Sequence, residues 1–127
     1  MEYKEKFGEL YKNAKDKFNI QQAPKLILKK DKENAKQVFG RTAHYEPGSQ
    51  TIVIFITNRH PKDILRSFCH EMIHHVQNER GDLDIKDELS SKYAQDDDHM
   101  REMEKEAYLE GNLLFRDHED QFKYEKK

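Results

Sequence analysis

The stretch from Pro61 to Gly81 constrains the fold most, because it combines an apolar helix face with polar side chains of fixed spacing along its border. Its apolar side chains recur at helical spacing and form one broad face. Pro61 is a favourable helix start and Gly81 a favourable stop. His70, His74 and Gln77 fall together beside the apolar face. The stretch therefore predicts a helix that packs on the core and holds two imidazoles at the core's border. The apolar positions are Ile64, Leu65, Phe68, Cys69, Met72, Ile73 and Val76.

His70 and His74 have the spacing needed to bind one metal ion together. Residues four apart lie on the same helix face, with Cβ atoms about 6 Å apart. Glu71 follows the first histidine and points about 100° around the helix, where it can reach a water on the metal rather than the metal itself. Zinc lowers the pKa of such a water, and a carboxylate can take its proton. The pattern His-Glu-x-x-His is therefore interpreted as a zinc centre with Glu71 as the general base.

A third zinc ligand is expected from the last helix, which is predicted over residues 99–123. A catalytic zinc ion usually has three protein ligands and one water. Glu104 falls within the apolar arc of this helix, where a carboxylate is costly unless it is paired or bound to metal. Glu110 lies at the edge of the arc and Glu106 on a charged side. Glu104 is the preferred ligand, and Glu106, Glu110 and His99 remain alternatives.

The other elements indicate an α+β fold in a single domain of residues 1–127. Residues 2–18 carry apolar side chains at helical spacing and predict an N-terminal helix. Runs of β-branched and aromatic residues predict a small three-stranded sheet, of which residues 51–57 are the most apolar run. The predicted strands cover residues 25–29, 37–45 and 51–57, and a short helix is expected within residues 82–93.

The charge balance argues against two classes of partner. The chain has 23 Lys and Arg against 25 Asp and Glu, so bulk electrostatic binding to nucleic acid or membrane is not expected. No apolar run approaches the roughly 18 residues of a membrane span, and the N-terminal residues lack the apolar segment of a signal peptide. The single cysteine, Cys69, cannot form an internal disulfide, which favours a reducing, cytoplasmic location. A monomer or a weak homodimer is expected.

The order of these elements resembles the minimal zincin core of metallopeptidases. A helix, three strands, the His70–His74 motif and a glutamate-bearing helix are similar to the gluzincins, and more narrowly to the very small ones called minigluzincins. The segment from Glu104 to Tyr108 also resembles the E-x-E-A-N element of the metallopeptidases that cleave phage repressors, with Tyr108 where that element has Asn. The first Glu of the element is a zinc ligand there, which implies the same role for Glu104. The resemblance covers the order of elements over about residues 25–115 and, in sequence, the two short motifs.

This resemblance implies a small zinc metallopeptidase that hydrolyses a peptide or protein substrate. His70, His74 and Glu104 would hold the zinc ion, and Glu71 would activate the water. In zincins the strand before the zinc helix borders the cleft and pairs with an extended substrate, which assigns this role to residues 51–57. The donor to the oxyanion is left open among His99, Tyr93, Tyr108 and His118.

Two alternatives to this function remain. A zincin-shaped protein could bind or regulate a partner with little turnover, although Glu71 is the group that distinguishes catalysis from metal binding alone. SprT-like zinc proteins share a strand before the histidine motif but take a later histidine as third ligand, and His99 could fill that role.

The segment after Phe115 is expected near the zinc site, because a chain of this length has no second domain to cover the cleft. In that arrangement His118, Glu119 and Asp120 would lie close to the zinc ion. A frayed, solvated tail is the preferred interpretation of the charged C-terminal end, and a tail that influences access to the cleft remains the alternative.

Overall fold

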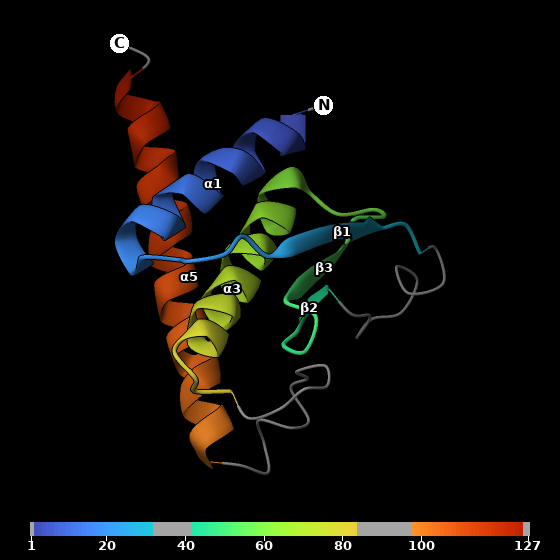
Figure 1. Cartoon of the computed structure of the whole chain (residues 1–127). Coiled ribbons are helices and arrows are strands. Elements are labelled where there is room, and N and C mark those ends of the chain that lie inside the picture. The colour runs from blue at the N-terminus through green and yellow to red at the C-terminus, as the bar shows by residue number, and fades with distance from the viewer. Residues whose placement is uncertain (1, 32–41, 84–97, 126–127) are drawn as a thin grey trace.

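The structure is a computed structural model that describes residues 2–31, 42–83 and 98–125. Within them the chain forms an α+β fold of three helices and a three-stranded mixed sheet (Figure 1). None of the helices in this part of the chain has both the length and the apolar character that crossing a membrane requires. The helices are α1 (Glu2–Phe18), α3 (Pro61–Glu79) and α5 (Asp98–Glu125), and the strands are β1 (Lys25–Lys29), β2 (Ala43–Glu46) and β3 (Thr51–Phe55).

The long helices form close to their predicted bounds. α1 has the predicted bounds, and α5 begins one residue earlier and ends two residues later than predicted. α3 begins at Pro61, and the His60 side chain caps it by accepting a backbone N–H of the first turn at 3.1 Å. It ends at Glu79, before Gly81, whose φ of 82° only glycine adopts readily. Of the predicted short helix, residues 84–93 lie outside the described residues.

The strand predictions hold in part. β1 has the predicted bounds. β3 ends at Phe55 rather than Thr57, because a turn follows in which Asn58 has a left-handed φ of 57°, a conformation that Asn tolerates. β2 covers Ala43–Glu46, while residues 37–41 of the predicted second strand lie outside the described residues.

β3 is the central strand of the sheet, whose order is β1-β3-β2. It runs parallel to β1, with Lys25 opposite Thr51, and antiparallel to β2, with Glu46 opposite Thr51. All five of its residues are buried, and a strand with neighbours on both sides characteristically has a continuous apolar sequence. The expectation that residues 51–57 offer a free backbone edge to a substrate is therefore wrong. In the described sheet the edges belong to β1 and β2.

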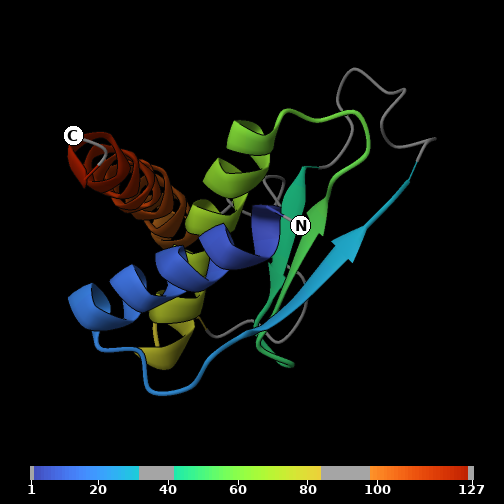
Figure 2. The same cartoon turned by 90° about the horizontal axis from the view of Figure 1, so that it is seen from above.

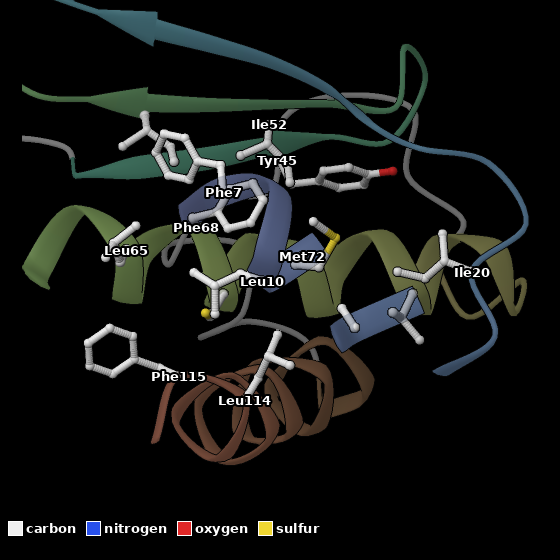
Figure 3. Close-up of a cluster of buried hydrophobic side chains, with 14 of the residues drawn as sticks. Phe7, Leu10, Ile20, Tyr45, Ile52, Leu65, Phe68, Met72, Leu114 and Phe115 are labelled. Carbon is white, nitrogen blue, oxygen red and sulfur yellow. The ribbon is translucent and has the colours of Figure 1, made fainter. Parts of the chain in front are cut away.

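α3 lies at the centre of the fold, with the sheet on one side and α5 on the other (Figure 2). α1 packs against both α3 and α5. The Phe7 ring of α1 lies 4.7 Å from the Phe68 ring of α3, and Figure 3 shows both rings in the core between the sheet and the helices. Further side chains of this core that are fully buried are Leu10, Ile52, Ile54, Ile64 and Met72.

His75 joins α3 to the sheet and to the connection between α1 and β1. Its Nε2 donates to the carbonyl of Gln22 at 2.6 Å, so its Nδ1 accepts from the Tyr45 hydroxyl at 2.7 Å. Asn78 in turn donates to that hydroxyl at 3.0 Å. Burial lowers the pKa of His75, which favours the neutral ring that these bonds require. The bonds fix which face of α3 is turned toward the sheet, and thereby which face is turned toward α5.

α3 and α5 run antiparallel. At the C-terminal end of α3, Arg80 pairs with Glu106 at 2.7 Å. At its N-terminal end, Lys62 pairs with Glu119 at 3.2 Å. The first half of α5 therefore lies beside the histidine-bearing half of α3.

Gly111 is the point of closest approach between the two helices. A Cβ atom built there would lie 3.0 Å from the Cα atom of His70 and 3.1 Å from its backbone nitrogen. Both distances are shorter than ordinary van der Waals contact, so a side chain at this position would push the helices apart. The missing side chain thus lets α5 lie directly on the backbone of the histidine motif.

Candidate metal centre

His70, His74 and Glu104 converge at the interface of α3 and α5. Glu104 Oε1 lies 2.8 Å from His74 Nε2, and Glu104 Oε2 lies 3.3 Å from His70 Nε2. The three donor atoms lie within 4.8 Å of one another. Ligands of a tetrahedral zinc ion lie roughly 3.3 Å apart, given metal–ligand bonds of about 2.0–2.1 Å. The spacing and the donor set, two imidazoles and a carboxylate, therefore fit a metal ion of the zinc type.

The carboxylate of Glu104 needs hydrogen-bond donors or a metal ion at this place. Burial opposes ionisation of Glu104, but its hydrogen bonds to His70 and His74 hold its pKa well below the usual range. An ionised carboxylate can only accept hydrogen bonds. Each imidazole nitrogen that faces it must therefore carry a proton or bind a metal ion. Burial opposes a charge on His74, but the hydrogen bond to Glu104 raises the pKa of His74.

Glu71 lies next to this group without being one of its three donors. The side chain is buried, with 7% of its surface exposed. Burial raises its pKa, the nearby imidazoles of His74 and His70 counteract the rise, and the charge of Glu104 adds to it. A second carboxylate thus lies within electrostatic range of the cluster, and its reach toward a metal-bound water stays a prediction.

The alternative third ligands contact other groups. Glu106 accepts from Arg80 at 2.7 Å, and Glu110 pairs with Lys17 at 3.4 Å. Among the described residues Glu104 alone joins the two imidazoles in a possible metal-binding group. The position of Glu104 within the apolar arc was the sequence signal that separated it from the other glutamates.

His99, the ligand that an SprT-like site would use, is also engaged elsewhere. Its Nε2 donates to the backbone carbonyl of Asp82 at 2.7 Å, and its side chain is exposed. It does not belong to the group of His70, His74 and Glu104. The geometry of the described residues therefore favours a two-histidine, one-glutamate set over a three-histidine set.

Tyr108 is the aromatic residue at the border of the cluster. Its ring packs edge-to-face on His70, with centroids 4.5 Å apart, while 63% of its surface is exposed. Leu109, beside it, is 61% exposed. His70 and Glu104 are themselves partly exposed, with 18% and 22% of their side-chain surfaces accessible, so the cluster is not sealed from solvent. Tyr93, another candidate donor, lies outside the described residues.

The C-terminal part of α5 lies away from the cluster, which overturns the expectation for the tail. His118 contacts Glu9 of α1 at 2.7 Å, and Glu119 contacts Lys62 at 3.2 Å. Lys62 precedes His70 by eight residues, or about 12 Å along a helix. The prediction failed because the antiparallel pairing carries α5 past the histidines toward the other end of α3.

Two residues of this region had no predicted role. Gln77 is fully buried, and its side-chain oxygen lies 2.8 Å from Nδ1 of His74. Its place one turn after His74 was visible in the sequence, but its partners on α5 were not. The contact of Gly111 with His70 depends on how two helices cross, which the sequence of either helix does not specify.

A comparison with protein-family models, curated proteins and solved structures finds no significant match. Any conclusion about function therefore depends on the residues of this chain.

Proposed function

We propose that the protein is a small zinc metallopeptidase of the gluzincin type. One observation carries the proposal: a single ionised carboxylate, Glu104, faces Nε2 of both histidines of a His-Glu-x-x-His motif, at 2.8 and 3.3 Å. A second carboxylate, Glu71, lies beside the group. Two imidazoles and one glutamate leave a coordination position for water, which distinguishes a catalytic zinc set from a closed structural one.

The residues of the cluster would have different roles in peptide hydrolysis. His70, His74 and Glu104 would hold the ion, and a bound zinc ion would supply Lewis acidity toward a water and a carbonyl. Glu71 would accept a proton from the attacking water and donate it to the amine that leaves. Burial makes Glu71 a stronger base than a solvent-exposed glutamate, as this role requires.

Tyr108 is the best-placed of the candidate donors to the substrate carbonyl. Its ring contacts His70, and most of its side chain is exposed. His118 lies at α1, and His99 is bonded to Asp82. We assign Tyr108 the role of substrate contact, and Tyr108→Phe separates a function of its hydroxyl from a function of its ring.

The edge of β2 is the proposed place for an extended substrate. β2 is an edge strand that contacts α3, whereas β1 forms the other edge and makes no contact with α3 among the described residues. A peptide added to β2 by backbone hydrogen bonds would therefore lie next to the helix that carries the histidines. This replaces the central strand β3 as the predicted substrate strand.

Zinc binding is tested first with a matched pair of substitutions on α5. Glu104→Gln removes the charge that faces the histidines. Glu102→Gln makes the same change on the exposed side of the helix, where Glu102 contacts Lys105 at 3.4 Å. The first variant is expected to lose zinc, and the second to keep one ion per chain. Equal zinc content in both would refute the assignment of Glu104.

Catalysis is tested with Glu71→Gln on an unfolded protein substrate. The variant should keep its zinc and fold but lose about 10²–10⁴-fold in rate, the usual contribution of a general base. Hydrolysis at the wild-type rate would show that Glu71 is not the base. Stable zinc binding by the wild-type protein without hydrolysis of any peptide would favour the alternative, a zincin-shaped binding or regulatory protein.

A further inference from the structure

We propose that Gln77 is a positioning residue that fixes the proton on Nδ1 of His74 and leaves Nε2 to bind the metal ion. The inference rests on the proposed zinc-binding role of His74. It assigns a supporting role to Gln77, which lies outside the metal-binding group.

The hydrogen bonds of Gln77 have only one consistent direction. Its side-chain nitrogen lies 2.8 Å from the carbonyl of Met103 and 2.8 Å from a carboxylate oxygen of Glu106. Both partners are acceptors, and the amide nitrogen has two hydrogens to donate. The amide oxygen must therefore face Nδ1 of His74, at 2.8 Å. Because that oxygen can only accept, Nδ1 carries a hydrogen, and Nε2 is the ring nitrogen left to bind a metal ion.

The orientation of Gln77 is itself held by an ion pair. Arg80 donates to both carboxylate oxygens of Glu106, at 2.7 and 3.1 Å. Glu106 thus remains an acceptor for Gln77. The pairing gives the two glutamates of the E-x-E element separate tasks, since Glu104 faces the histidines and Glu106 orients the amide behind one of them.

Burial makes this arrangement difficult to replace by solvent. Gln77 is 0% exposed and His74 is 1% exposed. A buried water in place of the amide could either donate a hydrogen bond to Nδ1 or accept one from it. The amide oxygen can only accept, so it permits only the ring form with a hydrogen on Nδ1. Groups that hydrogen-bond the second nitrogen of a metal-bound histidine typically contribute about 10–100-fold to metal affinity.

The test compares Gln77→Met, Gln77→Glu and the control Gln121→Met. Methionine has a similar length but cannot accept from Nδ1. Glutamate keeps an acceptor for Nδ1, but it loses both donated bonds and places a second negative charge beside Glu106. Gln121 is exposed near the end of α5, so its replacement reports on the loss of an amide alone.

The first readout is the ¹⁵N-bound proton on Nδ1 of His74, observed by NMR in the metal-free protein. Wild type, Gln121→Met and Gln77→Glu are expected to show a slowly exchanging Nδ1 proton, and Gln77→Met to lose it. Persistence of the slow signal in Gln77→Met would refute the proposal. This readout needs no bound zinc, so it stands even if the protein proves not to bind that metal.

The second readout sets zinc affinity against stability. Gln77→Met should bind zinc about 10–100-fold more weakly than wild type, while Gln77→Glu should bind more tightly than Gln77→Met despite unfolding more easily. If affinity instead follows stability across the variants, Gln77 has a structural role only. Unchanged affinity in Gln77→Met, with zinc bound by the wild type, would overturn this inference and leave the proposed peptidase function intact.

Discussion

Replacing Gly111 by alanine sets two effects of known size against each other. Glycine in a helix interior costs about 0.5–1 kcal/mol relative to alanine, so the substitution should stabilise α5 in isolation. The new Cβ atom, however, would lie 3.0 Å from His70 Cα, 3.1 Å from His70 N and 3.3 Å from the carbonyl carbon of Cys69. These are backbone atoms of α3, which cannot rotate out of the way as a side-chain end could.

The structure gives the size of the displacement. Ordinary contact begins at 3.4 Å, so the helices must separate by about 0.4 Å near His70. Inserting a methyl group into a packed interface typically costs about 1–3 kcal/mol. With the helix gain subtracted, Gly111→Ala should lower the free energy of unfolding by about 0–2.5 kcal/mol.

Gly8→Ala supplies the matched control. Gly8 lies within α1, and a Cβ atom there would have no neighbour within 4 Å. This variant should gain the full helix term, about 0.5–1 kcal/mol. Urea unfolding of both variants in a chelator measures the difference, which isolates the steric cost at Gly111.

Zinc affinity provides a second measurement on the same pair. Glu104 is two turns before Gly111 on α5, so a separation of the helices moves it away from the imidazoles. Metal–ligand distances are defined to about 0.2 Å, so a 0.4 Å shift should weaken zinc binding by roughly tenfold, or about 1.4 kcal/mol. If Gly111→Ala proves as stabilising as Gly8→Ala, or destabilises without weakening zinc binding, Gly111 does not set the distance between Glu104 and the histidines.

Two further predictions concern stability. Burial raises the pKa of Tyr45 from 10.0 to about 12, so the unfolded chain loses this proton before the folded one, and stability should fall by up to about 2–3 kcal/mol as the pH rises from 10 to 12. Tyr45→Phe should remove that part of the slope in chemical unfolding at several pH values, and an unchanged slope would contradict the assignment. Zinc at a hundred times its Kd should stabilise the wild type by about 2.7 kcal/mol over the chelated protein; in calorimetry this gain should disappear in Glu104→Gln and persist in Glu102→Gln.

The helices and strands whose apolar residues follow a clear pattern were predictable from sequence. The helix over residues 2–18 and the strand over 25–29 have the bounds that the pattern of apolar side chains indicates. The position of Glu104 next to His70 and His74 also follows from local rules, because a carboxylate within an apolar arc needs a partner. Its role as a metal ligand stays a prediction.

The errors arose where the answer depended on how elements pair. The run at residues 51–57 is apolar without alternation, which is typical of a strand buried on both faces, whereas the family resemblance implies a strand at the border of the cleft. The antiparallel crossing of α3 and α5 decides that His118 meets Glu9 rather than the histidine cluster. The partners of Gln77 on α5 depend on the same crossing, which no periodicity within a single helix specifies.

The bonds that hold His75 also determine which histidine is available to an ion. In an unfolded chain His74 and His75 are adjacent and chemically equivalent, so either could coordinate zinc together with His70. In the folded protein both nitrogens of His75 are occupied, one by the Gln22 carbonyl and the other by the Tyr45 hydroxyl, and competition for the ion is removed. Folding therefore selects the ligand, and it does so partly through Tyr45, a residue of a strand that supplies no donor to the cluster.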